Sequence, residues 1–452
     1  MGVKGDIVRE QNVIRVTYRA IGGRNQRMFR VNALFMGMVL VAGLMVCGAC
    51  SSSSTTPEPT DTTTTETTPP TETVTPEPVC GNGVVEEGEA CDDGGASATC
   101  TAECAVLECK PESTGQVTTV PAFDAEVFNW ADAHEKTFPF PDASVSVEKV
   151  TMYMTMACPP GGCDPWDRLG HLKVKRDTGE VGEDGEPVME AVEIARFITP
   201  YAIDKGMGGP GDCTWTYDVS AYQSLLRGEV TLSLFISTWI GGERGWSVTV
   251  WFDFHHGRAP LEAYQVHNLW NKGHLVYGHP DNPVDDHLAA KTVAVDAAAE
   301  KSVVRIITTG HGQGNTDNAA EFAMKQHTVK ANDQTHTWTL WRNDCAQNTC
   351  SPQGGNWQPG RAGWCPGDSV VPEDVDVSAA AVAGQDVDLD YDIEAYENCC
   401  RPDNESCNAS NGGCCMSFAG ECNYNYTGHT EPNFAVSSQL ILYRDPCGVV
   451  SQ

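Results

Sequence analysis

The segment VTMYMTM at residues 150–156 decides the fold class. Its side chains alternate without a break between two sets, Val150, Met152, Met154 and Met156 on one side and Thr151, Tyr153 and Thr155 on the other. Successive side chains of a strand point to opposite faces of a sheet. A period of two with one apolar face is therefore typical of an antiparallel strand that packs on one side.

The same alternation recurs along the rest of the chain. It is clear in VTLSLFISTW at 230–239 and SVTVWFDF at 247–254, and it returns in VVRIITT at 303–309, HTWTLW at 336–341, VDLDYDIE at 387–394 and SSQLILYR at 437–444. Helical periodicity is scarce, because only DAEVFNWADAHE at 124–135 and DVSAYQSLL at 218–226 suggest short helices. The sequence therefore predicts an all-β fold.

Many short strands with turn residues between them predict sandwiches or jelly rolls. The strand-rich region from residue 117 on is too long for one sandwich, so we expect two, an N-terminal one at 117–257 and a C-terminal one at 258–452. The C-terminal one contains a cysteine-rich insertion at 399–422.

The charge of the chain limits its partners. Lys and Arg number 29 and Asp and Glu number 61, which gives a formal net charge of 29 − 61 = −32. Such a field repels phosphate backbones and anionic headgroups. We expect no nucleic-acid partner, and contact with a membrane only through an attached lipid.

The N-terminal residues 1–50 are interpreted as an export signal. From Met28, a candidate true start, the chain reads MFRVNALFMGMVLVAGLMVCGAC, with an early Arg30 and an apolar run too short for a comfortable membrane span. The ending CGAC is similar to the lipobox of bacterial lipoproteins, with Cys50 as the acylated residue. The alternative is plain secretion with cleavage nearby. Either way we expect an exported protein, lipid-anchored at the bacterial cell surface or secreted.

Two segments separate this signal from the strands. Residues 51–79 are Ser, Thr, Pro and Glu with almost nothing apolar, which is typical of an extended tether. Residues 80–116 begin CGNGVVEEGEACDDG and resemble a short disulfide repeat of secreted bacterial proteins. Such a small module needs disulfides to fold. Its acidic residues Glu89, Asp92 and Asp93 are either solvated or hold calcium.

Without Cys47 and Cys50, 20 − 2 = 18 cysteines remain, and in an exported chain disulfides are their expected state.

The segment CPPGGCDPWDR at 158–168 comes directly after the strand predicted at 150–156 and carries reactive groups. Two cysteines close over four residues, and Asp164, Trp166, Asp167 and Arg168 come next. The segment has two interpretations. It is either a cross-linked surface turn on which Asp167 and Arg168 form an ordinary ion pair, or a cross-link that fixes reacting groups.

Four segments together resemble the peptide-N-glycosidase F family. They are CPPGGCDPWDRLGHLKVK at 158–175, EIARFITPY at 193–201, AEFAMKQHTV at 320–329 and GNWQPGRAGWCPG at 355–367. The resemblance runs from about residue 135 to 443. It implies two packed eight-stranded antiparallel jelly rolls with the active site between them. It also implies a monomer without cofactor or metal that hydrolyses the amide between the Asn side chain and the innermost GlcNAc of N-glycosylated proteins or peptides.

The resemblance also assigns roles to residues. Asp167 matches the family's essential acid, and Glu321 matches a second carboxylate that acts through a water. Hydrolysis of an amide requires an activated water, a donor to the oxyanion and a proton for the leaving nitrogen, which carboxylates and arginines can supply. Arg168 and Arg361 are expected to bind and polarise the substrate, and His311 falls on an active-site position. Asp164 is then a supporting or an exposed acid.

The tryptophans Trp166, Trp239 and Trp364 suit stacking on sugar faces, although such residues also belong to cores. Ser237 replaces an acid that the family uses to contact the chitobiose, and a charged acceptor is lost there. Glu243 lies nearby in sequence as a possible substitute. The residue after Glu321 is a phenylalanine, and the cysteines that flank this position in the family are Ala319 and Ala323 here, so this loop lacks its disulfide.

We expect the disulfides Cys158–Cys163 and Cys345–Cys365, while the cysteines of 399–422 have open pairings that include Cys213, Cys350 or Cys447. Two alternatives remain. The first is a non-catalytic glycan-binding lipoprotein on the same scaffold, supported by Ser237. The second is a copper oxidase based on histidines such as His255 and His256. Residues 386–397 have the acidic spacing of a calcium loop, but Tyr391 occupies the place that requires glycine, so we interpret this segment as a strand with an acidic face.

Overall fold

The computed structural model describes residues 7–10, 13–16, 79–86, 89, 92, 112–182, 185–201, 212–401, 404 and 430–447. Near the start of the chain, β1 (Ile7–Glu10) pairs with β2 (Val13–Val16) in an antiparallel ladder. The predicted tether, Cys50, and most of the cysteine-rich module and insertion lie outside the described residues. Residues 76–452 form one compact unit.

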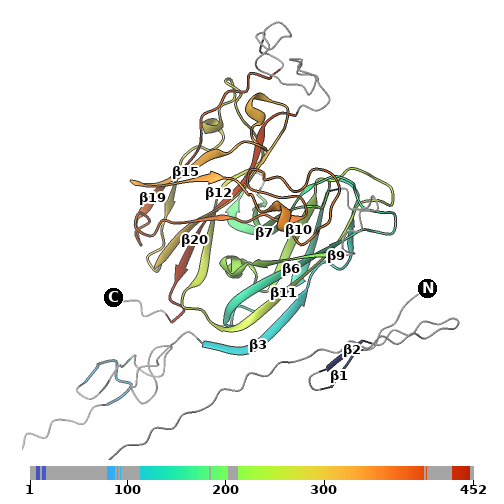
Figure 1. Ribbon diagram of the computed structural model, residues 1–452. Helices are drawn as coiled ribbons and strands as arrows, with labels where there is room; N and C mark the ends of the chain where they lie inside the picture. Colours follow the sequence, from blue (N-terminus) through green and yellow to red (C-terminus); the bar gives the residue numbers. More distant parts are fainter. Residues whose placement is uncertain are drawn as a thin grey trace, which may run out of the picture. The chain divides into compact units, whose positions relative to one another are not determined.

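The N-terminal jelly roll consists of two antiparallel sheets (Figure 1). The first sheet has the order β3-β11-β6-β9 with β4 paired to β11, and the second has the order β8-β7-β10-β5 with the short β17 added at its β8 edge. The strands are β3 (Glu112–Pro121), β4 (Glu126–Phe128), β5 (Ala133–Pro139), β6 (Val147–Ala157), β7 (Leu169–Val181), β8 (Pro187–Ile198), β9 (Asp212–Asp218), β10 (Glu229–Ile236), β11 (Trp246–Arg258) and β17 (Asp368–Ser369).

The C-terminal jelly roll repeats this plan with two four-stranded sheets, β12-β20-β14-β18 and β13-β19-β15-β16. Its strands are β12 (Glu262–Val276), β13 (Lys291–Ala294), β14 (Lys301–His311), β15 (Lys325–Ala331), β16 (Gln334–Leu340), β18 (Glu373–Asp376), β19 (Asp386–Ile393) and β20 (Asn433–Arg444). Short 3-10 turns lie at Ser220–Leu225, Val284–Asp286, Thr316–Asn318 and Cys345–Gln347. The prediction of two antiparallel jelly rolls is confirmed, with eight main strands in each, to which the N-terminal roll adds the short β4 and β17.

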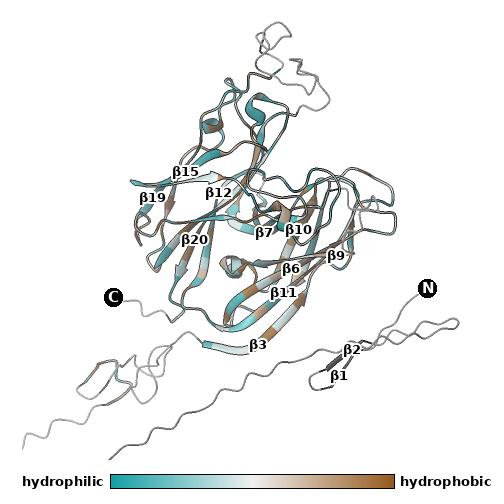
Figure 2. Cartoon of the chain, in the orientation of Figure 1, coloured by the Kyte–Doolittle hydropathy of each residue, from teal (hydrophilic) through white to brown (hydrophobic). Residues whose placement is uncertain are grey.

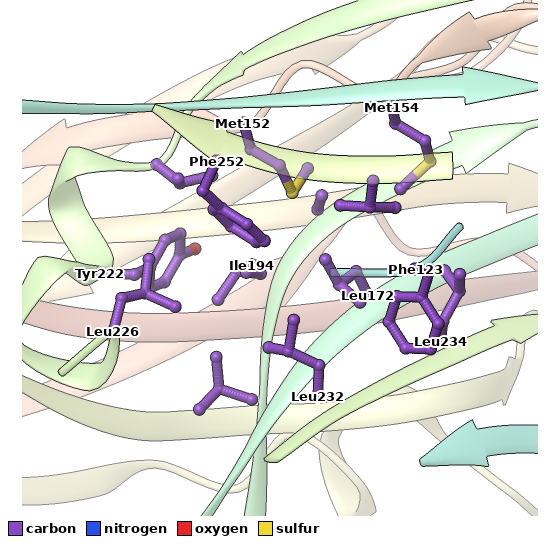
Figure 3. Close-up of a cluster of buried hydrophobic side chains, with 14 of the residues drawn as sticks. Phe123, Met152, Met154, Leu172, Ile194, Tyr222, Leu226, Leu232, Leu234 and Phe252 are labelled. Atoms are coloured by element: carbon purple, nitrogen blue, oxygen red, sulfur yellow. The ribbon is translucent and has the colours of Figure 1, made fainter. Parts of the chain in front are cut away.

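Strand β6 shows why the alternation decides the fold. Met152 and Met154 are fully buried and pair in register with Phe252 and Val250 of β11. They belong to the same buried cluster as Leu172 of the opposite sheet (Figure 3). Along β6 and β11, hydrophobic and hydrophilic residues follow one another closely (Figure 2). Removal of this apolar face from water at about 25 cal/mol per Å² is what drives the two sheets together.

The helix predicted at 124–135 is wrong. This segment forms β4 and the start of β5, and Phe128 is fully buried opposite Trp246. Glu126 accepts a hydrogen bond from the His134 ring, 2.8 Å away, and forms an ion pair with Lys136. Long-range strand pairing overrides a short helical pattern here. The second predicted helix, at 218–226, is only the 3-10 turn Ser220–Leu225.

The two rolls are joined by covalent and polar contacts as well as by apolar packing. Cys213 of β9 is bonded to Cys350, so neither of them pairs with the insertion. Arg196 of β8 donates from Nη1 to Thr309 Oγ1 of β14 and to the Ala435 carbonyl of β20, at 3.1 and 2.6 Å. The seam, which is the interface between the two rolls, is therefore held by contacts between residues that lie far apart in the chain.

Candidate active site

The loop between β6 and β7 carries Asp167 and is braced covalently and by hydrogen bonds. Cys158 is bonded to Cys163, which is one of the expected pairs. The Gly245 N–H donates to the Gly162 carbonyl at 3.0 Å, and the Asp164 N–H donates to the Gly245 carbonyl at 3.1 Å. A Cβ at Gly161 would lie 2.2 Å from the Glu243 carbonyl oxygen, so only glycine allows this close packing. The position of Asp167 is therefore set by a rigid turn.

Asp164 is the supporting acid of this loop and is not exposed at all. Its Oδ2 accepts from Arg168 Nε at 2.7 Å and from Thr238 Oγ1 at 2.6 Å, and its Oδ1 accepts from the Trp166 N–H at 3.0 Å. Arg168 therefore pairs with Asp164, and the surface pair of Asp167 with Arg168 does not form. A buried charge with this many partners fixes the geometry of the residues around it.

Glu321 comes from the other roll, shortly after the turn Thr316–Asn318. Its Oε1 accepts from Arg361 Nε at 3.3 Å, and its Oε2 accepts from the Gly312 N–H at 3.2 Å. The Ala362 N–H donates to the Glu321 carbonyl at 2.9 Å, which ties the segment to the Arg361 loop. Glu321 is thus held by one side chain and by backbone groups.

The two carboxyl groups lie close enough to affect one another. Burial raises the pKa of Asp167 to about 6, and the charge of Arg361 opposes this rise. Burial raises the pKa of Glu321 to about 7, where the Arg361 charge opposes and the Asp167 charge adds to the effect. Both carboxyl groups therefore have pKa values near neutral pH, which is the range that acid–base catalysis needs.

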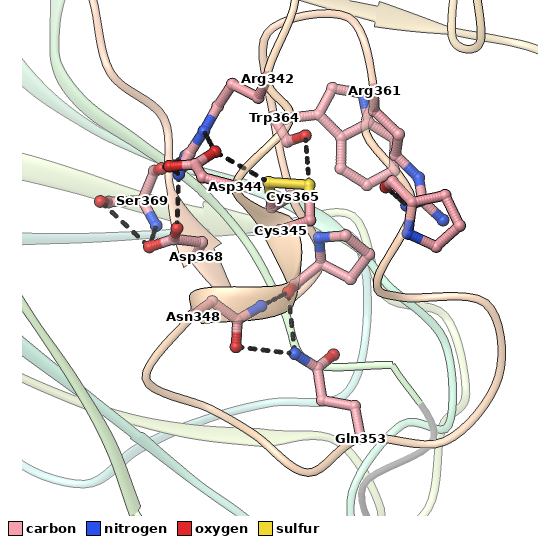
Figure 4. The surroundings of a disulfide bond; sticks show 12 residues. Arg342, Asp344, Cys345, Asn348, Gln353, Arg361, Trp364, Cys365, Asp368 and Ser369 are labelled. Atoms are coloured by element: carbon pink, nitrogen blue, oxygen red, sulfur yellow. Dashed lines mark hydrogen bonds and ion pairs between the residues drawn. A yellow bond between two sulfur atoms is a disulfide. The ribbon is translucent and has the colours of Figure 1, made fainter.

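Arg361 is the buried cation of the site. Its Nη1 donates to the Pro359 carbonyl at 2.9 Å, Nη2 donates to the Asn356 carbonyl, and the guanidinium lies 4.9 Å from the Trp364 ring centre. The Cys345–Cys365 disulfide, the second expected pair, holds the end of this loop, and Figure 4 shows it beside Arg361 and Trp364. The loop thus presents Arg361 to both carboxyl groups.

Trp364 does not have the stacking role that the sequence predicts. Only 3% of it is exposed, and its Nε1 donates to the Gly310 carbonyl at 2.7 Å. It packs with Ile198, Ile307 and Val370 between the two rolls. A buried indole offers no face to a sugar, so Trp364 positions Arg361 instead.

His311 lies behind Trp364, with ring centres 5.4 Å apart. Thr309 Oγ1, which accepts from Arg196, lies 2.8 Å from His311 Nε2. Burial lowers the pKa of His311 to about 3, with the charges of Arg196 and His274 adding to it. His311 is therefore neutral and does not contact the two carboxyl groups directly.

Two of the predicted tryptophans are accessible. Trp166 is 49% and Trp239 is 56% exposed. The Arg168 guanidinium covers one face of Trp239, 4.2 Å from the ring centre. Ser237 is half-buried at the end of β10, and its N–H donates to the Leu169 carbonyl at 2.9 Å. Glu243 is exposed beside Gly161. Sugar-sized apolar faces are thus available around Asp167.

Sequence reasoning missed Tyr201. Its ring packs edge-on against Trp166, with ring centres 5.7 Å apart, and burial and the Asp167 charge raise its pKa while the Arg361 charge opposes the rise. The Tyr201 N–H donates to Gln353 Oε1 at 2.7 Å, and a Cβ at Gly355 would lie 1.4 Å from the Tyr201 ring. The available signal was its place as the last residue of EIARFITPY, one of the four segments used for the resemblance.

The remaining candidates are placed as follows. On β11, His255 Nε2 lies 3.3 Å from Thr151 Oγ1, and His256 Nε2 lies 2.7 Å from Thr118 Oγ1. In the described part of the chain, no group of three or more His, Cys, Asp or Glu side chains is arranged to hold a metal ion. The segment 386–393 is strand β19, as its alternation predicts. Over the same described ranges, no helix is long and apolar enough to cross a membrane.

Fold and site together define the class of protein. It is a double jelly-roll protein with a hydrolase-like site of two carboxyl groups and one arginine at the seam. Residues 135–253 match the family model described as peptide-N-glycosidase F, N terminal, and residues 281–417 match peptide-N-glycosidase F, C terminal. The chain belongs to the peptide-N-glycosidase F family.

Individual relatives agree with this assignment. The chain is 30% identical over 273 residues to the peptide-N(4)-(N-acetyl-beta-D-glucosaminyl)asparagine amidase F of Elizabethkingia miricola, which is 58% of this chain and 73% of that protein. Among solved structures it is similar to PNGase F, a glycosylasparaginase from Flavobacterium meningosepticum, with a TM-score of 0.57 and 24% identity over 73% of this chain and 96% of that one. PNGF-II gives a TM-score of 0.53 at 16% identity, over 73% and 65% of the two chains. At these sequence identities the two structures support the fold of this chain and nothing beyond it.

Proposed function

We propose that this chain hydrolyses the amide between the Asn side chain and the innermost GlcNAc of N-linked glycans, and so releases a glycosylamine and leaves Asp. The observation that carries the proposal is the convergence of Asp167 and Glu321, one from each roll, on the buried Arg361. The relative in Elizabethkingia miricola, whose name describes this activity, supports the choice of substrate.

The division of labour follows the resemblance, in which Asp167 matches the essential acid of the family. The Asp167 carboxylate, whose pKa burial raises to about 6, accepts a proton from the attacking water. The water oxygen bonds to the amide carbon, and the Arg361 guanidinium offsets the charge of the oxyanion. Glu321, with a pKa of about 7, donates its proton to the leaving nitrogen as the C–N bond breaks. Asp167 ends protonated and Glu321 ionised, and solvent resets both.

The test uses the protein produced under oxidising conditions with a denatured high-mannose glycoprotein in ¹⁸O-enriched water. We expect deglycosylation, with one heavy oxygen incorporated into the new Asp at the glycosylation site. Asp167→Asn should abolish this conversion. Asp253→Asn, whose carboxylate accepts a hydrogen bond from Thr119 of the paired strand β3, is the matched control and should retain it. Conversion that persists in Asp167→Asn would refute the assignment.

A non-catalytic glycan-binding protein is the second candidate, because the acid that the family uses for the chitobiose is Ser237 here. The two proposals separate on one panel of glycans that includes core-fucosylated ones. Glycan binding without conversion of any member of the panel would favour the binding protein.

We further propose that the protein is exported, with Cys50 as the lipid-attachment residue. Fractionation of cells that express the full chain tests this proposal. The wild type should sediment with membranes, and Cys50→Ala should release it. Equal distribution of both would favour plain secretion.

A further inference from the structure

One exposed tryptophan has no part in the site described above. Trp130, in the loop between β4 and β5, is 59% exposed, more than Trp166 or Trp239. Its neighbour Phe128 is fully buried and supplies the core contact of this segment. No aromatic ring or cation of the described residues is paired with the Trp130 indole. Packing in the fold therefore does not account for this side chain.

The Trp130 loop is joined to the loop that carries Trp239. The Gly241 N–H donates to the Asn129 carbonyl at 2.9 Å, and Asn129 Nδ2 donates to the Gly242 carbonyl at 2.6 Å. A Cβ at Gly241 would lie 3.8 Å from Cζ3 of Trp130, so the indole edge lies over this glycine. Gly241 is two residues from Trp239, a span of about 7 Å at most. The two exposed indoles are thus near neighbours.

The same loop is fixed to the turn that positions Asp167. Arg244 donates from Nε and Nη2 to the Cys163 carbonyl, at 3.1 and 2.6 Å. The Gly245 N–H donates to the Gly162 carbonyl at 3.0 Å. Trp130, Trp239 and the disulfide turn therefore form one rigid piece, and the distance from Trp130 to the reacting groups is fixed.

Charged groups near Trp130 indicate what it can bind. Asp132, two residues further along the chain, has a side chain that is 63% exposed, and Glu243 is exposed in the adjoining loop. The Arg244 guanidinium is directed at the Cys163 carbonyl. Exposed carboxylates accept hydrogen bonds from hydroxyl groups and repel anions. An indole face beside carboxylates suits the C–H face and the hydroxyls of a neutral sugar.

We propose that Trp130 forms an outer saccharide subsite, which stacks on a neutral hexose of the glycan beyond the sugars at Asp167. This inference rests on the proposed amidase function and extends it to substrate recognition. The glycan runs from the reacting groups across Trp239 to Trp130. The subsite contributes to binding and not to chemistry, because Trp130 has no contact with Asp167, Glu321 or Arg361.

The test compares two glycopeptides with the same peptide, one with a full neutral high-mannose glycan and one trimmed to chitobiose. Trp130→Ala should raise KM for the full glycan about three- to tenfold, as expected for loss of one stacking contact. The KM for the trimmed substrate and both kcat values should not change. Trp130→Tyr should restore most of the affinity, and Val127→Ala, an exposed change in the same segment, should have no effect.

Two results would overturn the subsite. An equal KM increase for both substrates would mean that Trp130 contacts the peptide or only supports the loop. An unchanged KM for the full glycan would mean that no sugar binds there. Titration of free neutral oligosaccharide into Asp167→Asn, with and without Trp130→Ala, gives a readout that does not need hydrolysis. Weaker binding in the double variant supports the subsite even if the chain is no amidase, and equal binding excludes it.

Discussion

Asp167 and Glu321 are held by different means. Asp167 follows a disulfide ring and sits beside the buried Asp164, which binds three donors. Glu321 lies in a segment without a disulfide, where Ala319 and Ala320 are fully buried. A Cβ at Gly310 would lie 2.3 Å from the Ala320 carbonyl, so close packing of small residues replaces the cross-link. The N-terminal half of the site is redundantly braced, while the C-terminal half depends on packing and on Arg361.

This difference predicts unequal tolerance of mutation. Loss of one brace near Asp167 leaves the others in place, whereas loss of Arg361 removes the only side-chain hydrogen bond that Glu321 has in the described structure. The experiments below test the contrast between the two halves.

The largest effect is expected from the two carboxyl groups themselves. Asp167→Asn should lower kcat about 10³-fold or more, and Glu321→Gln about 10²-fold, because loss of the general base stops the attack while water can replace a proton donor in part. Initial rates of glycopeptide hydrolysis measure both, with Asp253→Asn as control. A Glu321→Gln loss that equals the Asp167→Asn loss would remove the distinction in roles.

The next effect concerns the arginine that the two halves share. Arg361→Met should lower kcat/KM about 10²-fold, since the oxyanion loses its cationic partner. Because the Arg361 charge holds both carboxyl pKa values down, the same change should also shift the pH–rate profile to higher pH. Arg444→Met, which breaks an exposed pair with Glu262, is the matched control and should shift nothing. A profile that does not move would mean that Arg361 does not affect the titrating pair.

A smaller effect is the pH dependence of stability. The folded pKa values of Asp167 and Glu321, about 6 and about 7, lie above the ordinary 3.8 and 4.5. The native state therefore binds more protons than the unfolded state. The contribution of these two groups to the free energy of unfolding falls as pH rises from about 4 to about 7. Denaturant unfolding at both ends of this window should show a smaller loss in the Asp167→Asn/Glu321→Gln variant than in the wild type. Equal losses in both proteins would contradict the raised pKa values.

The smallest effect on activity is expected from removal of the ring disulfide. Cys158→Ser/Cys163→Ser should lower the free energy of unfolding by about 2 kcal/mol, the chain-entropy value for so short a loop. The kcat should change only a few-fold, because the Asp164 hydrogen bonds remain. Thermal unfolding and initial rates measure the two quantities. A loss of kcat comparable to that of Asp167→Asn would show that the ring, and not Asp164, fixes the geometry.

The sequence predicted the fold well where one strand face is buried, as in β6. It failed at 124–135, where Phe128 is placed by pairing with a strand more than a hundred residues away. It named the carboxyl groups and Arg361 as candidates through the resemblance, because compact motifs carry them, and their roles stay predictions. It could not show that Asp164 rather than Asp167 binds Arg168, or that Trp364 is buried. Those facts depend on how two distant loops meet, and a one-dimensional pattern does not contain that information. Tyr201 and Trp130 were missed for the same reason.

The guanidinium of Arg196 has a consequence for biosynthesis. Its bonds to Glu193 form within the first roll, but its Nη1 bonds need Thr309 and the carbonyl of Ala435 in β20, the last strand described. A nascent chain therefore holds an incompletely satisfied cation at the future seam until β20 has been synthesised. Because β20 also lies between β12 and β14, the second roll cannot close earlier. The enzyme proposed here would thus be inert on the ribosome and would become competent only after β20 has been synthesised.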